Sequence, residues 1–274
     1  MSDGSGDTSS RRQERPELSP LLLVRDSVAA LGQSDLFLRL ATAPAVGLFV
    51  SQLLLYLVGL RIEYDPMSTT PPSGATILAL LLDYLALLVF TTLFTVNWTR
   101  ALLLGPAAVT GLGLHWGARE TRYLLRAAAI AIVPVIGMIL AMLPILALFG
   151  QSPITGAVML IVFVVYLFVV VRLSLLLPAA ALDHPFGLRE ALALPGRLAA
   201  RLLAAQLLVT LPYVVGALLL SLVLELVGLA RMAPFASQFV FLVLAFLFFA
   251  VSAGIYALAF QAIVGSRPRA MLSA

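Results

Sequence analysis

Long apolar stretches without a charged residue recur along this chain, and they constrain its fold more than any other feature. No charge occurs between Arg39 and Arg61, or between Arg126 and Arg172. About 20 apolar residues in an α-helix cross the roughly 30 Å hydrocarbon core of a bilayer. Because these residues lie in blocks rather than at the period of a half-buried element, we expect lipid to surround them. The sequence therefore predicts an all-α, polytopic membrane helix bundle.

Polar turns divide these stretches into about six transmembrane helices. Prolines and carboxylates indicate a loop at 61–74, and a Gly-Gln-Ser-Pro turn at 150–153 divides the longest uncharged run. Residues 1–20 are polar and predict a disordered cytoplasmic tail, which precedes a six-helix transmembrane domain at 21–274. The spans are expected at about 40–60, 75–97, 127–149, 154–177, 202–224 and 236–262.

Short amphipathic segments next to the spans predict cytoplasmic interfacial helices. Leu21, Val24 and Val28 recur at helical spacing, with Arg25 and Asp26 on the other side. A helix of this kind lies on the membrane surface with its apolar face toward the acyl chains. We therefore expect one such helix before the first span and others in the cytoplasmic turns.

Composition and charge indicate the membrane and the orientation. The chain is 62% hydrophobic and 11% charged, whereas soluble domains average about half and about a quarter. Every basic residue is arginine, which is typical of a GC-rich bacterial genome, and with six crossings all of them except Arg61 and Arg231 share one side. The positive-inside rule then predicts a bacterial inner-membrane protein whose N- and C-termini are both cytoplasmic. Arginines that flank apolar runs form no basic patch, so no nucleic-acid partner is expected.

The sequence offers no recognisable catalytic, metal or cofactor site. Cysteine is absent, which excludes disulfides and thiolate ligands. His115 and His184 lie in different turns, and neither has a second ligand at helical spacing. An intramembrane lipid enzyme would have to use these histidines with Glu120, Asp183 and Glu190.

Asp83 is the most informative single residue because it interrupts the second span. A carboxylate inside a span costs on the order of 2.5–3.5 kcal/mol on insertion scales, and such residues often serve function. A proton or cation relay is one interpretation. The other is that Asp83 is protonated, hydrated near the outer surface, or paired with Arg61. We treat Asp83 and Arg61 as a candidate intramembrane polar site.

Arginines at the cytoplasmic edges of the spans are candidate contacts for anionic phospholipids. Spacings of three and four residues place neighbouring arginines on one helical face. Each cation near an anionic membrane surface contributes about 1 kcal/mol to binding. Simple anchoring by side chains that extend to the headgroups explains the same pattern. The candidates are Arg119, Arg122, Arg126, Arg172, Arg189, Arg197 and Arg201.

Two cytoplasmic turns share an aromatic residue, a glycine and an Arg-Glu pair. The segments are 116–121 (Trp-Gly-Ala-Arg-Glu-Thr) and 186–191 (Phe-Gly-Leu-Arg-Glu-Ala), with a weaker echo at 25–27 (Arg-Asp-Ser). They suggest a unit of one surface helix and one helical hairpin that is used three times. Chance similarity over so few positions is the alternative.

The chain resembles a family of bacterial six-helix inner-membrane proteins related to the membrane domain of some glycerophosphodiester phosphodiesterases. The resemblance rests on segments at 97–105 (Asn-Trp-Thr-Arg through Leu-Gly), 117–123 (Gly-Ala-Arg-Glu-Thr-Arg-Tyr) and 172–191 (Arg-Leu-Ser through Leu-Arg-Glu-Ala). Family members often have His-Arg where this chain has Thr99-Arg100, so a role for that histidine does not transfer. The resemblance implies a fold and a location, and it implies no reaction because the soluble catalytic domain is absent.

Two functions follow from these patterns. The first is a non-enzymatic membrane protein that acts through contacts with lipid and with an unknown membrane-protein partner, in envelope organisation or assembly. The second is a small-solute or proton-coupled transporter that uses Asp83. Few polar residues near the midplane favour the first.

Overall fold

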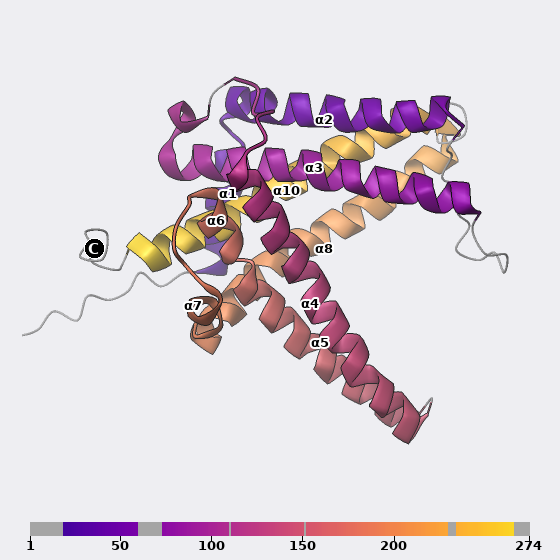
Figure 1. The fold of residues 1–274 in the computed structure, drawn as a ribbon, viewed down its shortest axis with the longest axis vertical. Coiled ribbons are helices and arrows are strands. Elements are labelled where there is room, and N and C mark those ends of the chain that lie inside the picture. The colour runs from indigo at the N-terminus through magenta and orange to yellow at the C-terminus, as the bar shows by residue number, and fades with distance from the viewer. Residues whose placement is uncertain (1–18, 60–72, 110, 151, 230–233, 266–274) are drawn as a thin grey trace, which may run out of the picture.

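The computed structural model describes residues 19–59, 73–109, 111–150, 152–229 and 234–265, and every regular element in these ranges is helical (Figure 1). The long helices are α2 (Ser34–Leu57), α3 (Gly74–Leu104), α4 (Ala118–Phe149), α5 (Pro153–Leu173), α8 (Gly196–Leu226) and α10 (Pro234–Gly265). The short elements are α1 (Pro20–Ala30), the 3-10 turn η1 (Pro106–Ala108), α6 (Leu176–Ala181) and α7 (Leu188–Leu192). The predicted all-α fold is confirmed for these ranges.

Six helical segments of the described chain are long and apolar enough to cross a membrane. The shortest is α2 with 24 residues, which at about 1.5 Å per residue exceeds the roughly 30 Å hydrocarbon core. The fourth segment, Thr155–Ala181, runs from α5 into α6. The chain is therefore a multi-pass membrane protein.

Several helices continue past the ends of the expected spans. The second and third spans were expected at about 75–97 and 127–149, but α3 reaches Leu104 and α4 begins at Ala118. A span that is predicted from the absence of charged residues ends near the first arginine. The helix itself continues because its backbone hydrogen bonds are satisfied internally at every depth, while arginine side chains reach toward the headgroups.

Serine caps and glycine turns begin and end helices at the hairpin tips. The Ser73 hydroxyl accepts a hydrogen bond from the Thr76 amide at 3.1 Å, and Ser152 caps Thr155 in the same way at 3.3 Å. Gly150 adopts a positive φ of 56°, a conformation that favours glycine. This turn divides the long apolar run into α4 and α5, as the sequence predicts.

Helix α10 lies at the centre of the bundle. It packs against α1, α2, α3, α6 and α8. Phe94, Trp98 and Phe246 form an aromatic core between α3 and α10, with the Phe94 and Phe246 rings 5.0 Å apart. Trp98 is fully buried, and its indole nitrogen donates to the Ala250 carbonyl at 2.9 Å. The indole polar group is thus satisfied inside the protein.

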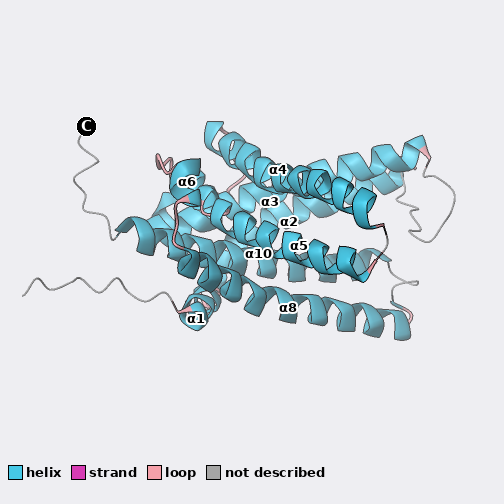
Figure 2. Ribbon diagram, turned by 90° about the horizontal axis from the view of Figure 1, so that it is seen from below, coloured by secondary structure: helices cyan, strands magenta, loops and turns pink. Residues whose placement is uncertain are grey.

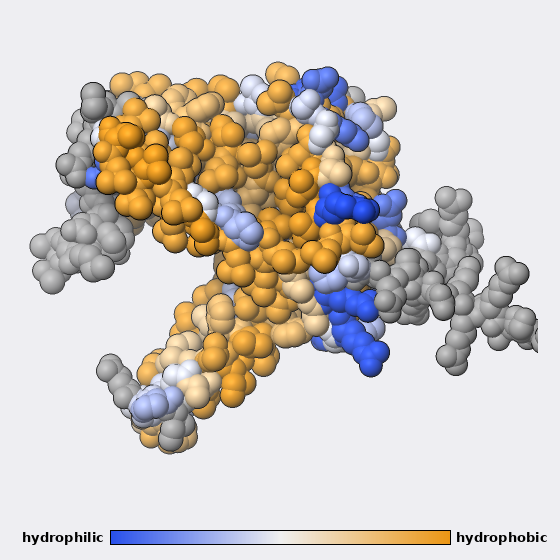
Figure 3. All heavy atoms as spheres, turned by 180° about the vertical axis from the view of Figure 1, so that it is seen from behind, coloured by the Kyte–Doolittle hydropathy of each residue, from blue (hydrophilic) through white to orange (hydrophobic). Residues whose placement is uncertain are grey.

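The α4–α5 hairpin diverges from the other long helices. Figure 1 shows α4 and α5 leaving the bundle together, away from α2, α3, α8 and α10. In the space-filling view, apolar residues cover most of the face shown, both on the main body and on the part that projects from it (Figure 3). Many large apolar side chains on α4 are exposed: Ile132, Val133, Ile136, Ile139, Leu140 and Leu143. In a membrane these faces contact lipid or another apolar surface.

Helix α1 is a packed element of the bundle and contacts α8 and α10. Its buried residues are Leu23 and Ser27, whereas Leu21 and Val28 are exposed. Ser27 is buried because it lies against Gly254, where an added Cβ would come within 3.1 Å of the Ser27 Cβ. Of the side expected to be apolar, Leu21 and Val28 are thus exposed, whereas Val24 packs against the protein core.

All arginines of the described residues lie at one end of the bundle, where α2, α4 and α8 begin and α3, α5 and α10 end. We call this the arginine end. Figure 2 shows α1 and α6 at this end, with the long helices running away from it. Figure 3 shows the most hydrophilic residues gathered on one side of the molecule.

Candidate functional site

Asp183 is the centre of a polar network at the arginine end. Its Oδ2 accepts from Arg119 Nε at 2.9 Å, and its Oδ1 accepts from Arg122 Nη2 at 2.7 Å. The carboxylate thus joins two successive arginines of α4 to the segment after α6. The Asp183 side chain is 37% exposed and that of Arg119 is 33% exposed. Solvent screening therefore limits the strength of the network.

Local backbone geometry points Asp183 at α4. Its φ of 56° is positive, which ends α6 in a left-handed turn. The amide of His184 donates to the Ala179 carbonyl at 2.9 Å across this turn. Aspartate tolerates the left-handed region better than most non-glycine residues. The turn therefore accommodates the charged residue without a glycine.

Three further arginines bind backbone carbonyls of the short helices. Arg100 Nη1 donates to Ala181, the last residue of α6, at 3.2 Å, and Arg126 Nη1 donates to Leu176 at 3.1 Å. Arg172 Nη1 donates to Leu192, the last residue of α7, at 3.2 Å. Ala181 and Leu192 end their helices, where the last carbonyls lack intrahelical partners and carry partial negative charge, whereas Leu176 is the first residue of α6. Arginines from the long helices thus hold α6 and α7 in place.

The repeated Gly-x-Arg-Glu segments form the same cap in both places. The Glu120 carboxylate accepts from the Gly117 amide at 2.9 Å, and Glu190 accepts from Gly187 at 2.7 Å. This contact satisfies an amide that the start of a helix leaves unpaired. The sequence similarity therefore has a common local structure.

The helices that follow the two caps differ. The first cap begins the long α4, whereas the second begins only the five-residue α7, which ends before Pro195. At 25–27, Arg25 Nε donates to Asp26 in the middle of α1, so this echo forms no cap. The unit that was expected three times is therefore found at two places. The two segments share the glutamate cap but not the helix that follows it.

The arginines predicted to contact anionic lipid fall into separate groups. Arg119 and Arg122 share one ion-pair partner, the Asp183 carboxylate. Among the described residues, Arg126 and Arg172 donate hydrogen bonds to backbone carbonyls and not to a carboxylate. Of the others, Arg189 and Arg197 are exposed and Arg201 is half-buried. Arg172 binds the last carbonyl of α7, whereas the Asp183 carboxylate binds Arg119 and Arg122.

Asp83 has a partner that the sequence did not indicate. Gln52 Nε2 on α2 donates to Asp83 Oδ1 on α3 at 3.1 Å, and both residues are half-buried. The pair lies in the half of the α2–α3 hairpin away from the arginine end. Arg61, the expected partner, lies outside the described residues. Gln52 was missed because a residue 31 positions away gives no periodic signal.

A second polar contact inside the bundle joins α8 to α10. Gln206 Nε2 donates to the Ser252 hydroxyl at 3.1 Å and to the Thr210 hydroxyl at 3.3 Å. Gln206 Oε1 is buried and has no partner among the described residues. Gln206 and Ser252 were not among the site residues predicted from the sequence, because a lone glutamine and a lone serine in apolar runs resemble ordinary packing residues.

The two histidines lie in different environments. His115 is exposed. The His184 ring packs edge-on against Phe260 with the centroids 5.4 Å apart. No group of three or more His, Cys, Asp or Glu residues in the described ranges is placed to hold a metal ion.

Comparison of the chain with family models, curated proteins and solved structures finds no match.

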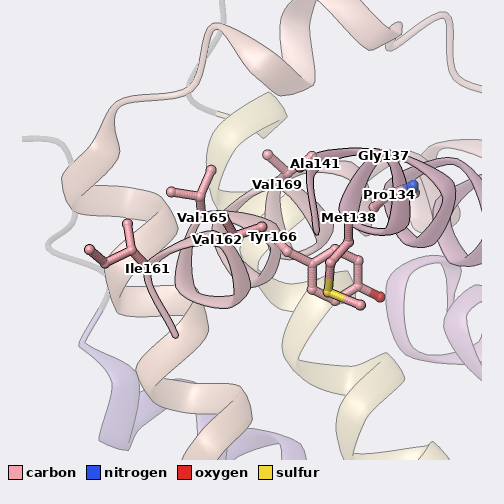
Figure 4. A pocket seen from close by; sticks show the side chains of 9 residues that line it. All are labelled: Pro134, Gly137, Met138, Ala141, Ile161, Val162, Val165, Tyr166 and Val169. Atoms are coloured by element: carbon pink, nitrogen blue, oxygen red, sulfur yellow. The ribbon is translucent and has the colours of Figure 1, made fainter. Parts of the chain in front are cut away.

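An apolar groove lies between α4 and α5 and encloses about 360 Å³. Figure 4 shows the side chains that line it, from both helices of the hairpin. The lining residues are Pro134, Gly137, Met138, Ala141, Ile161, Val162, Val165, Tyr166 and Val169. The Tyr166 hydroxyl is the only polar side-chain group among them. The small Gly137 and Ala141 create the space, and nothing lies within 4 Å of a Cβ added at Gly137.

Proposed function

We propose that this protein is a non-enzymatic component of the bacterial inner membrane that acts through contacts with lipid and with a membrane-protein partner, in envelope organisation or assembly. Both termini lie in the cytoplasm, so the arginine end faces the cytoplasm. The positive-inside rule supports this orientation, because every described arginine is at that end.

The diverging α4–α5 hairpin is the observation that carries the proposal. Its side chains present apolar surface such as Leu140, which is 63% exposed, and Leu143, which is 57% exposed. No residue at 135–149 of α4 is buried inside the protein, so lipid or another apolar surface has to cover this half of the helix. A catalytic function would instead need convergent polar groups.

The polar groups at the arginine end support the non-catalytic assignment. Asp183 is bound to two arginines, and the Glu120 carboxylate is used in a helix cap. A general acid or base has to present a free proton-accepting or proton-donating atom to a substrate. These carboxylates are engaged in holding helices together.

Site-specific photocrosslinking in native membranes tests the proposal. A photoreactive amino acid at Leu140 or Leu143 should crosslink to lipid and to a specific protein. A photoreactive residue at Leu54, an exposed position on α2, serves as the control for random membrane contacts. A crosslinking pattern identical at α2 and α4 would contradict the special role of the hairpin. Uptake of a defined solute by purified protein in liposomes would contradict the non-transporting assignment.

A proton- or solute-coupled carrier is the second candidate, and the Gln52–Asp83 pair favours it. A carboxylate held by an amide inside a membrane hairpin is a group that can bind a proton or a cation. Under this function Asp83→Asn abolishes uptake in liposomes. Under the leading proposal Asp83→Asn leaves photocrosslinking at Leu140 unchanged. Gln206→Leu, which removes another intramembrane polar group, is the control.

A further inference from the structure

The α4–α5 groove has the dimensions and the chemistry of a site for a hydrocarbon chain. Its volume of about 360 Å³ falls in the range of about 300–1,000 Å³ typical of small-molecule pockets. Eight of its nine lining residues have no polar side-chain group. Ile161 and Val165 line the groove yet are 63% and 57% exposed, so it opens to the surroundings of the helices. An apolar groove that opens to the bilayer is accessible to lipid.

Each helix of the hairpin places one arginine on a groove-lining side, toward the arginine end. Arg126 stands about three helical turns from Gly137, and Arg172 stands about three turns from Ile161. Residues separated by whole turns lie on the same side of a helix. Three turns cover roughly 16 Å, about half of the roughly 30 Å hydrocarbon core. The groove also includes Pro134 and Val169, which lie only eight and three residues from these arginines. It therefore extends from near the charges to about the depth of one leaflet.

The two arginines keep hydrogen-bonding capacity and positive charge for an anion. Neither forms an ion pair with a carboxylate of the described chain, unlike Arg119 and Arg122, which share the Asp183 carboxylate. Each guanidinium has five N–H donors, and the described contacts use one on each side chain. Arg172 Nε is buried and has no partner among the described residues. A buried donor of this kind indicates a missing acceptor.

We propose that the α4–α5 groove binds one acyl chain of an anionic phospholipid, whose phosphate is held at the arginine end by Arg126 and Arg172. This inference deepens the proposed function and rests on its lipid contacts. It commits to a phospholipid because the apolar groove begins near the two arginines and extends to about the depth of one leaflet. Inorganic phosphate would satisfy the arginines but leave the groove without an occupant.

A photoactivatable lipid tests the site on the purified full-length protein. The probe is phosphatidylglycerol with a diazirine in the middle of one acyl chain, and phosphatidylcholine with the same chain is the comparison. We expect phosphatidylglycerol to label peptides that contain 134–141 and 161–169, and an excess of unlabelled phosphatidylglycerol to suppress the labelling. Inorganic phosphate should not suppress it. Equal labelling by the two lipids, or suppression by phosphate alone, would overturn the assignment.

Paired variants separate the groove from the charges. Ala141→Leu fills the groove and should reduce labelling at least threefold, whereas Ala147→Leu, an exposed position on the other side of α4, should not. Arg126→Gln and Arg172→Gln keep a donor for the Leu176 and Leu192 carbonyls but remove the charge. Each should weaken phosphatidylglycerol binding about fivefold, equivalent to about 1 kcal/mol. Arg39→Gln, at an exposed arginine of α2 that is not among the candidate lipid contacts, is the matched control for net charge.

Two results distinguish this inference from the proposed function. Unchanged labelling in Ala141→Leu would reject the groove, even if photocrosslinks from Leu140 still identify a protein partner. Solute uptake in liposomes would reject the non-transporting function without affecting the lipid site. If Ala141→Leu fails to fold, shown by aggregation in gel filtration, the glutamine variants still decide the assignment of the phosphate.

Discussion

Asp183 affects the stability of the protein in two ways, through an ion-pair network and through an unusual backbone conformation, and substitutions at this one residue can separate the two effects. Its carboxylate binds Arg119 and Arg122, while its backbone has a positive φ of 56°. Partial exposure means that the ion pairs contribute a modest free energy, which depends on salt. The conformation contributes independently because most non-glycine residues avoid it.

Replacement of Asp183 by Asn and by Ala is expected to destabilise the protein to different extents. Asn removes the charge but tolerates the left-handed turn, so the loss should be about 1 kcal/mol. Ala adds a conformational cost of about 1–2 kcal/mol. Thermal unfolding in detergent at low and high salt measures both, and only the Asn effect should shrink almost completely at high salt. Equal losses for Asn and Ala would show that the turn is not strained.

At the scale of the element, the glutamate cap determines how α4 begins. Glu120 is only 5% exposed, and its carboxylate accepts from the Gly117 amide. Glu120→Ala should cost about 1 kcal/mol, whereas Glu120→Gln should cost less because glutamine serves in the same cap. Hydrogen exchange of the amides at 117–121 should accelerate in the Ala variant alone. Equal exchange in the two variants would mean that the cap does not hold this turn.

Helix α1 is held on α10 by a close contact at Gly254. A Cβ at this position would lie 3.1 Å from the Ser27 Cβ, whereas Gly216 on α8 has nothing within 4 Å. Gly254→Ala should therefore destabilise the protein by about 1–3 kcal/mol, typical of overpacking, and expose α1 to protease. Gly216→Ala is the control and should be close to neutral. Similar unfolding temperatures for the two variants would contradict the packing of α1.

Small residues in the spans illustrate what a pattern can and cannot predict about helix contacts. Gly137, Gly216 and Gly254 all allow close approach, but only Gly254 has a neighbour within 4 Å. Gly47, which no pattern distinguished, lies so close to Phe90 that an added Cβ would overlap its ring. Small size permits contact, and the arrangement of neighbouring helices decides where contact occurs.

At the scale of the whole molecule, the orientation can be tested with single cysteines because the chain has none of its own. Ala75 lies in the first turn of α3, away from the arginine end, and Ala193 follows α7 at that end; both are exposed. In intact spheroplasts an impermeant maleimide should label Ala75→Cys and not Ala193→Cys. Permeabilised cells should label both. The reverse pattern would invert the orientation, and equal labelling in intact cells would contradict the membrane crossings.

Sequence alone determined that the chain crosses a membrane as about six helices and that its arginines gather at one end. Both properties depend only on residues that are neighbours in the sequence. The length of an apolar stretch determines whether it crosses the bilayer, and the cost of moving arginine across the bilayer determines which side the turns occupy. It did not determine which helices meet. Asp83 binds Gln52, Asp183 binds Arg119 and Arg122, and α4–α5 diverges from the bundle. Lipid makes every apolar helix face equally acceptable, so no hydrophobic period selects neighbours, and only tertiary packing decides which polar groups come together.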